Sequence, residues 1–199
     1  MESKLLLDSG EITRTLERLA YQIMEKHAGC ENTMLVGIER RGADLARRLK
    51  RILAERAGRD VPLGTLDINL YRDDWTSMEA TPHVGPSFIP CDLTGASVVL
   101  VDDVLYTGRT IRSALEAILD YGRPASVELL VLIDRGHREL PIQANYVGRT
   151  INTSKEEHVD VLLAAAWGVP LCNADCPPAV ACRNIARRLE GEAVPLMLR

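Results

Sequence analysis

The fold of this chain is decided by one stretch, Val98-Val99-Leu100-Val101-Asp102-Asp103-Val104-Leu105-Tyr106-Thr107-Gly108-Arg109-Thr110. Its first four residues are apolar and favour β-structure, which predicts a strand buried on both faces of a parallel sheet. Asp102 and Asp103 follow at the carboxyl end of this strand, where open α/β sheets bind their ligands. The apolar spacing from Ile111 onward predicts that a helix begins directly afterwards.

The residues after this strand suit a phosphorylated pentose. Two neighbouring carboxylates accept hydrogen bonds from vicinal hydroxyls or lie beside a hydrated cation. Residues 107–110 open the helix, so backbone N–H groups and two threonine hydroxyls converge where the helix dipole favours a phosphate. The alternative is a buried strand, a capped helix and two exposed acids. Neither a Walker A motif nor Gly-x-Gly-x-x-Gly occurs in the chain, so these two common nucleotide-binding loops are excluded.

The composition predicts one domain with its own core. The chain has 199 residues, of which 46% are hydrophobic and 26% charged. No apolar run is long enough to span a bilayer, and residues 1–4 show no signal-peptide pattern, so we expect a cytoplasmic location without membrane insertion. The five cysteines are then expected to be thiols. A net charge of −4 argues against an all-over basic protein but leaves a local basic face open.

Helical and apolar segments alternate along the chain, which predicts an α/β fold with an open, mostly parallel twisted sheet flanked by helices. We expect helices at 11–27, 43–56 and from 110 to 121, and strands at 33–38, 64–71, 96–103 and 126–134.

Other charged turns follow the predicted strands. Arg40 and Arg41 before Gly42 would suit a diphosphate, although two arginines before a helix are also typical of a solvated turn. Residues 71–90 form a long polar loop that carries Arg72, and this segment is either a closing loop or a mobile insertion. His137, in the turn after the strand at 126–134, is either a titrating group, a phosphate ligand or a structural cap.

Four segments together resemble the bifunctional pyrimidine operon attenuation regulator and uracil phosphoribosyltransferase family, a group of type I phosphoribosyltransferases. The resemblance covers residues 4–161 and implies the type I phosphoribosyltransferase fold with a small hood. The segments are Val36-Gly37-Ile38-Glu39-Arg40-Arg41-Gly42, Leu70-Tyr71-Arg72-Asp73-Asp74, the stretch quoted first, and Asp134-Arg135-Gly136-His137-Arg138-Glu139-Leu140-Pro141-Ile142.

The resemblance implies roles for individual residues. Asp102, Asp103 and Arg72 would carry catalysis, the carboxylates by holding the ribose hydroxyls and Arg72 from the closing loop. Mg²⁺ would be held mainly through the substrate, with no direct protein ligand. The resemblance implies that Arg40 and Arg41 bind the diphosphate and that Arg135 and Val159 bind the base. The implied residues for the 5-phosphate are Val104, Leu105, Tyr106, Thr107, Gly108, Arg109 and Thr110.

The implied reaction joins uracil to phosphoribosyl diphosphate and gives UMP and diphosphate. No lysine occurs between Lys50 and Lys155, so the hood lacks the lysine that purine transferases typically direct at a purine oxygen. The absence of this lysine favours a pyrimidine. Two alternatives stay open: a transferase for another nucleobase, and an RNA-binding transcription regulator with little catalysis.

The resemblance also implies binding to messenger RNA of the pyrimidine operon, often by a dimer or a higher homo-oligomer. Glu17, Tyr21 and Gln143 stand where RNA-binding members usually have neutral, imidazole or basic residues, and Glu17 would repel a phosphate. The cations that would contact RNA phosphates are Arg14, Arg18, Arg47, Arg48, Arg51, Arg138 and Arg149.

The predicted transferase domain spans residues 1–161, with its closing loop at 71–90 and hood segments around 135–161. Residues 162–199 form an atypical carboxyl-terminal tail, whose structure and role the sequence leaves open. The tail contains Cys172, Cys176 and Cys182, but their spacing matches no zinc-binding pattern.

Overall fold

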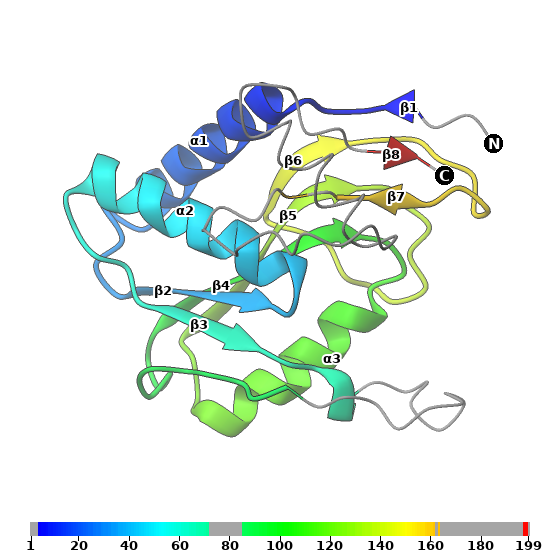
Figure 1. Cartoon of the computed structure of the whole chain (residues 1–199). Helices are drawn as coiled ribbons and strands as arrows, with labels where there is room; N and C mark the ends of the chain where they lie inside the picture. Colours follow the sequence, from blue (N-terminus) through cyan, green and yellow to red (C-terminus); the bar gives the residue numbers. More distant parts are fainter. Residues whose placement is uncertain (1–3, 72–84, 162, 164–196, 199) are drawn as a thin grey trace, which may run out of the picture. The chain divides into compact units, whose positions relative to one another are not determined.

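The computed structural model describes residues 4–71, 85–161, 163 and 197–198. The chain divides into two compact units, residues 14–155 and residues 1–13 with 156–199. Each unit has a sheet of its own (Figure 1). The predicted domain boundary after residue 161 stays a prediction.

Five parallel strands form the sheet of the larger unit, in the order β3-β2-β4-β5-β6. They are β2 (Thr33–Ile38), β3 (Leu63–Leu66), β4 (Ser97–Leu105), β5 (Ser126–Asp134) and β6 (Tyr146–Thr150). The strand predicted from the first stretch is β4, which lies in the middle of the sheet and is almost wholly buried. The predicted open parallel α/β sheet is confirmed.

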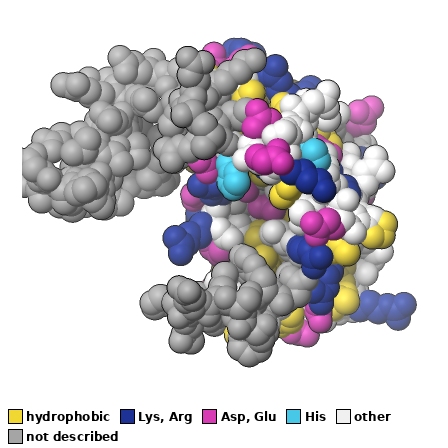
Figure 2. Space-filling view, turned by 90° about the vertical axis from the view of Figure 1, so that its right-hand side faces the viewer, with side chains coloured by type: hydrophobic (Ala, Val, Ile, Leu, Met, Phe, Trp, Pro, Cys, Tyr) yellow, Lys and Arg dark blue, Asp and Glu magenta, His cyan; other side chains and the backbone are white. Residues whose placement is uncertain are grey.

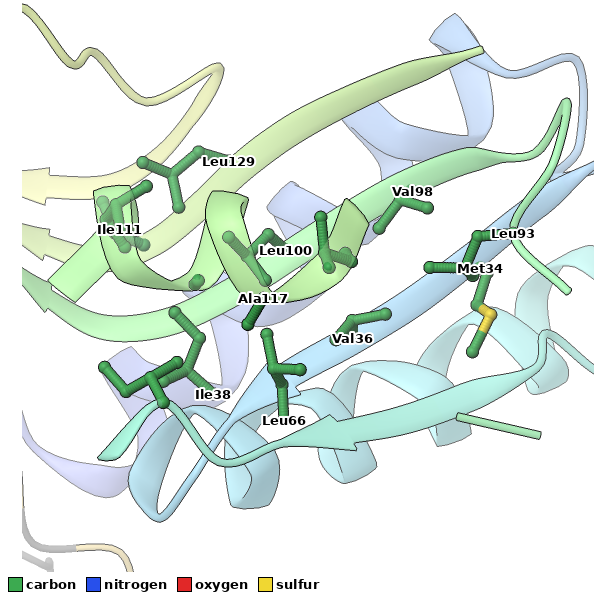
Figure 3. Close-up of a cluster of buried hydrophobic side chains, with 14 of the residues drawn as sticks. Met34, Val36, Ile38, Leu66, Leu93, Val98, Leu100, Ile111, Ala117 and Leu129 are labelled. Atoms are coloured by element: carbon green, nitrogen blue, oxygen red, sulfur yellow. The ribbon is translucent and has the colours of Figure 1, made fainter. Parts of the chain in front are cut away.

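Helices cover both faces of this sheet. Figure 3 shows Val36, Ile38 and Leu100 packed beneath α3 (Arg109–Ile118), together with Ile111 and Ala117 of that helix. Helices α1 (Ser9–Lys26) and α2 (Arg41–Ala57) lie side by side on the opposite face (Figure 1). Alternate strand residues point to opposite faces, so an uninterrupted apolar strand supplies both layers of the core.

Two glycines bring the start of α2 against the ends of β2 and β4. A Cβ atom on Gly42 would lie 2.3 Å from the carbonyl oxygen of Val101, and a Cβ on Gly37 would lie 2.5 Å from the Cα of Ala43. Both neighbours are backbone atoms, one in β4 and one in α2, that cannot move independently of those elements. Only glycine therefore allows the first turn of α2 to lie beside the carboxyl end of β4.

The third strand is shorter than the sequence predicted. We expected a strand over 64–71, but β3 ends at Leu66, and Asn69–Tyr71 form a 3-10 turn in which Leu70 is 67% exposed. The Asp67 carboxylate accepts hydrogen bonds from the backbone N–H of Asn69 at 2.8 Å and from that of Gly85 at 2.5 Å. A side-chain acceptor that captures nearby backbone donors ends a strand because it competes with ladder pairing.

The buried carboxylate of Glu128, near the amino-terminal end of β5, attaches the end of α1 to the sheet. Glu128 receives hydrogen bonds from Lys26 at 2.9 Å and from Tyr146 at 2.5 Å, and it lies 3.0 Å from His27 Nε2. Burial alone would raise the pKa of Glu128, but these hydrogen bonds outweigh it and hold the pKa below its ordinary value.

The smaller unit contains an antiparallel sheet in the order β1-β8-β7, made of Lys4–Leu5, Met197–Leu198 and Val159–Asp160. Asp8 and Glu11 cap the start of α1 reciprocally, because each side chain accepts a hydrogen bond from the backbone N–H of the other, at 2.7 and 2.8 Å. None of the helices in the described residues has the length and apolar character needed to cross a membrane.

Candidate active site

Asp102 and Asp103 lie near the carboxyl end of β4, where the backbone holds both carboxylates. Asp102 Oδ1 accepts a hydrogen bond from the N–H of Asp103 at 2.9 Å, and Asp103 Oδ1 accepts one from the N–H of Val104 at 2.9 Å. Asp102 is only 7% exposed. Its burial, together with the nearby charge of Asp103, raises the pKa of Asp102 well above its ordinary value.

The turn between β2 and α2 places cations beside this pair. Arg40 and Arg41 are exposed, and the peptide bond between Glu39 and Arg40 is cis. Arg41 Nη1 lies 3.5 Å from Asp103 Oδ2, an ion pair that the close approach of Gly42 to β4 makes possible. The turn therefore presents positive charge at the same edge of the sheet as the two carboxylates.

These groups share one pocket of about 420 Å³. It brings together the predicted residues of the Arg40–Arg41 turn, the aspartate pair and the start of α3. Four of its lining residues, Ile38, Glu39, Ile68 and Asn69, were not predicted from the sequence. Asn69 is a polar residue in the turn after β3. The pocket is lined by Ile38, Glu39, Arg40, Arg41, Ile68, Asn69, Asp102, Asp103, Val104 and Thr110.

Positive and negative side chains lie close together at this end of the molecule. Figure 2 views the side toward which the parallel strands point, and Lys, Arg, Asp and Glu side chains are interspersed there. A mixed surface of this kind suits a ligand that carries both hydroxyls and phosphates, because each kind of group finds a complementary partner.

Residues 104–110, which we call the phosphate loop, comprise the end of β4, the turn at 106–108 and the start of α3. Gly108 directly precedes the helix with φ at 93°, a left-handed conformation that favours glycine. The first N–H groups of a helix have no partner within the helix, so the start of α3 offers donors to an anion. Thr110 lines the pocket, whereas Leu105 and Gly108 are buried. Arg109 Nε is 2.7 Å from Glu139 Oε2.

Residues 134–142, which we call the hood turn, begin at the last residue of β5. Arg135 is 5% exposed and donates to Thr153 Oγ1 at 3.1 Å and to the carbonyl of Ser154 at 2.8 Å. Its guanidinium carbon lies 4.2 Å from the centre of the Tyr106 ring. Arg135 therefore connects the hood turn to the phosphate loop and to the segment that follows β6.

His137 has a structural place in the hood turn. Its Nε2 lies 2.6 Å from the carbonyl oxygen of Thr153, which requires that nitrogen to carry a proton. The ring also meets Tyr106 edge to face, with centroids 5.9 Å apart. Of the three interpretations of His137 drawn from the sequence, these contacts favour the structural one.

The arginines expected to contact RNA differ in their surroundings. Arg18 donates to the carbonyl of Gly148 at 2.6 Å, and Arg47 lies 2.6 Å from the Asp44 carboxylate. The guanidinium of Arg138 is hydrogen-bonded inside the larger unit, which counts against a contact between Arg138 and RNA. The remaining four expected contacts, Arg14, Arg48, Arg51 and Arg149, lie on α1, α2 and β6.

Some of the residues singled out in the sequence lie outside the described part of the chain or in the smaller unit. Arg72 and the three tail cysteines Cys172, Cys176 and Cys182 lie outside the described residues. Val159 belongs to β7 of the smaller unit. In the described residues, the two cysteines, Cys30 and Cys91, are free thiols.

Residues 3–165 match the model of the phosphoribosyl transferase domain. The chain belongs to the phosphoribosyltransferase family. Two relatives named bifunctional protein PyrR place it more narrowly. That of Thermus aquaticus is 53% identical over 156 residues, which are 78% of this chain and 86% of the relative. That of Pelotomaculum thermopropionicum is 52% identical over 162 residues, 81% of this chain and 90% of the relative. The resemblance seen in the sequence motifs is thus confirmed, and the chain is a phosphoribosyltransferase of the PyrR group.

Solved phosphoribosyltransferases share the fold. A hypoxanthine-guanine phosphoribosyltransferase of Bacillus anthracis superposes with a TM-score of 0.63 at 19% identity, over 78% of this chain and 86% of that chain. A hypoxanthine phosphoribosyltransferase of Trypanosoma cruzi also gives 0.63, at 23% identity, over 78% of this chain and 83% of that chain. At these identities the likeness shows the type I phosphoribosyltransferase fold and says nothing about the base.

The raised pKa of Asp102 predicts how stability changes with pH. A carboxyl whose pKa is higher in the folded than in the unfolded state stabilises the fold while protonated, and this stabilisation is lost as the pH rises above about 4. Asp102→Asn keeps an acceptor for the N–H of Asp103 and stays neutral. We therefore expect this variant to unfold at a higher urea concentration than the wild type at about pH 7.5, with a smaller difference at about pH 4.5.

The control is Asp60→Asn, because the Asp60 side chain is 76% exposed and lies beside Lys50 on the surface. We expect it to leave the unfolding midpoint nearly unchanged at both pH values. A stabilising effect of Asp102→Asn that did not change with pH would contradict the assigned cause.

Proposed function

We propose that this phosphoribosyltransferase transfers the ribose 5-phosphate group of phosphoribosyl diphosphate to uracil and releases UMP and diphosphate. The observation that carries the proposal is the single pocket in which the aspartate pair, the Arg40–Arg41 turn and the start of α3 meet. Carboxylates, cations and helix amides are the partners that the hydroxyls, the diphosphate and the 5-phosphate of this substrate require. The name of the PyrR relatives supports a second, regulatory activity beside the transferase.

Each part of the substrate has a proposed partner. Asp102 and Asp103 accept hydrogen bonds from the vicinal ribose hydroxyls, and the phosphate loop binds the 5-phosphate. Arg40 and Arg41 flank the diphosphate. Arg72, on the predicted closing loop, excludes water and contacts the diphosphate, while Arg135 belongs to the hood over the base. The part in base binding that the resemblance implies for Val159 stays a prediction. Arg72 and Val159 rest on the family resemblance alone.

The donors present fit a magnesium ion that is held mainly by the substrate. The described residues contain no group of three or more His, Cys, Asp or Glu side chains that could hold a metal by themselves. Two carboxylates at the pocket wall suit the hydroxyls and water molecules around such an ion, because Mg²⁺ prefers oxygen ligands and retains several waters. The ion would supply charge that stabilises the departing diphosphate.

The proposed chemistry follows from the charges in the pocket. Breaking the bond between ribose C1 and the diphosphate leaves positive charge on the sugar and negative charge on the leaving group. Arg40 and Arg41 oppose the negative charge, and the aspartate pair holds the sugar while positive charge develops on it. A ring nitrogen of uracil attacks C1 as the bond from C1 to the diphosphate oxygen breaks, and the proton of that nitrogen passes to the departing diphosphate or to water. The protein therefore supplies no nucleophile and forms no covalent intermediate.

The proposed choice of uracil rests on the hood and on the relatives. The chain has no lysine between Lys50 and Lys155 that could reach a purine oxygen. Backbone groups of the hood would read the edge of a pyrimidine instead. A cytoplasmic location and a homo-oligomeric state stay predictions.

The decisive test supplies phosphoribosyl diphosphate and Mg²⁺ with each nucleobase in turn and measures diphosphate release. We expect release with uracil, accompanied by UMP, and release at least about a hundredfold slower with hypoxanthine or guanine. Chelation of Mg²⁺ should abolish release. Faster transfer to a purine would overturn the choice of base, and no transfer to any base would overturn the proposed activity.

Substitutions in the pocket test the assigned roles. Asp103→Asn removes a charge and one strong acceptor, and Thr110→Ala removes a hydroxyl beside the predicted phosphate site. We expect kcat/KM for phosphoribosyl diphosphate to fall by about 10- to 100-fold in each, since each lost hydrogen bond to a charged group is worth about 1.5–3 kcal/mol. Thr13→Ala, on the exposed side of α1, is the matched control. Full activity of both pocket variants in folded protein would show that the site is wrongly assigned.

We also propose that the outer face of α1 and α2 binds pyrimidine operon RNA, and that UMP strengthens this binding. Arg47 and Arg51 are exposed on α2 and support the proposal. Glu17 opposes it, because its carboxylate lies 3.6 Å from Arg56 and offsets that charge. The Tyr21 ring also covers Arg56, with the guanidinium 6.0 Å from its centre.

A binding assay on leader RNA tests this second activity. We expect Glu17→Gln to tighten binding about three- to tenfold at low salt and Arg51→Gln to weaken it, because long-range charge controls such complexes. Asp60→Asn is the control, because it shows how much the loss of one surface negative charge by itself changes the affinity for RNA. The absence of a salt-dependent shift for both the wild type and Glu17→Gln would refute RNA binding by this face.

A further inference from the structure

Arg138 uses all three of its guanidinium nitrogens inside the larger unit. Nε donates to the carbonyl of Ile142 at 3.0 Å, and Nη2 lies 2.5 Å from the carboxylate of Asp134. Nη1 faces the carbonyls of Tyr106 at 2.8 Å, Gly136 at 3.0 Å and Leu105 at 3.4 Å. The side chain is 22% exposed. A guanidinium has five N–H donors in a fixed plane, and these contacts occupy most of them.

The partners of Arg138 belong to two segments that are far apart in the chain. Leu105 and Tyr106 are in the phosphate loop, whereas Asp134, Gly136 and Ile142 are in the hood turn. A single side chain thus connects the segment that leaves β4 to the segment that leaves β5.

Backbone hydrogen bonds extend the same connection. The carbonyl of Leu105 also accepts from the N–H of Arg135 at 3.1 Å, and that of Thr107 accepts from Glu139 at 2.9 Å and from Leu140 at 3.2 Å. The side chains of Leu140 and Ile142 are so close to Gly108 that a Cβ there would lie 3.4–3.5 Å from them. The hood turn therefore supports the loop over consecutive residues.

The direction of these carbonyls determines the direction of the amides that follow them. In a trans peptide the C=O and N–H bonds of one plane point in opposite directions. Because the carbonyls of Leu105, Tyr106 and Thr107 are bound by the hood turn, the next three N–H groups point away from it. Amide N–H groups that point the same way before a helix form an anion site.

We propose that Arg138 is a positioning residue for the sugar phosphate: it holds the carbonyls of residues 105 and 106 so that the amides of the phosphate loop are oriented in advance for the 5-phosphate. The inference rests on the proposed function, since it assumes that this loop holds the phosphate of the substrate. Arg138 does not touch the ligand. It lowers the cost of binding because the loop does not have to reorganise when the phosphate arrives.

Calorimetric titration of the full chain with two separate ligands tests the proposal. Ribose 5-phosphate requires the phosphate loop, whereas inorganic diphosphate requires the Arg40–Arg41 turn. We expect Arg138→Gln to weaken ribose 5-phosphate binding at least about tenfold and diphosphate binding less than about twofold. Arg138→Lys keeps the charge but has all its donors on one atom, so we expect an intermediate loss of about threefold.

Arg59→Gln is the matched control, because Arg59 is about half exposed and lies 3.2 Å from Glu31 at the surface. It should leave both affinities unchanged. Circular dichroism checks that each variant is folded. If Arg138→Gln does not fold, the affinities of Arg138→Lys alone test the proposal. Unchanged ribose 5-phosphate affinity, or an equal loss for both ligands, would overturn the inference.

The outcome is distinguishable from a failure of the proposed function. A wild-type chain that binds ribose 5-phosphate but transfers nothing to uracil would refute the proposed reaction and leave the role of Arg138 standing. A wild-type chain that does not bind ribose 5-phosphate would overturn the role of Arg138.

Discussion

The buried carboxyl of Asp102 beside Asp103 is the constraint on which the rest of the site depends. Two adjacent carboxylates repel each other, and burial adds a desolvation cost, so the pKa of Asp102 rises. The surrounding fold maintains this arrangement. Parallel neighbours hold β4 on both sides, and Gly42 lets α2 approach it so that Arg41 pairs with Asp103. The carboxylates are therefore fixed acceptors before any ligand is present, which is what differential stabilisation of a transition state requires.

The surrounding fold also holds the groups of the site that donate hydrogen bonds, and these groups suit an anion. The carbonyls of the phosphate loop are held by the hood turn through Arg138 and backbone N–H groups. Arg135 stacks on Tyr106 and continues to residues 153–154. These contacts join the region proposed for the base to the region proposed for the phosphate.

The meeting of the aspartate pair and the Arg40–Arg41 turn in one pocket could be predicted from the sequence, but the contacts that support them could not. The strands at 33–38 and 126–134 were predicted with the bounds that the structure shows, because apolar runs end there in glycine-containing or charged turns. The strand predicted at 64–71 was too long, since periodicity does not reveal that Asp67 captures backbone donors from residues on both sides of the 72–84 segment. The aspartate pair and the Arg40–Arg41 turn could be predicted because parallel strands end at one edge. The contacts of Arg138 and Arg135 could not, since they join segments about thirty residues apart whose relative position depends on the folded sheet.

Helix α2 extends from the pocket proposed for catalysis to the face proposed for RNA binding. It begins at Arg41, which faces the pocket, and Arg56, near its other end, pairs with Glu17. At about 1.5 Å per residue these two positions are about 22 Å apart along the axis, which exceeds two Debye lengths of about 8 Å at physiological salt. Direct charge effects between them are therefore screened. For the proposed RNA binding, the Glu17 carboxylate on the outer face therefore acts without altering the pocket, and an influence of UMP on RNA would require movement of the protein rather than the field of the bound nucleotide.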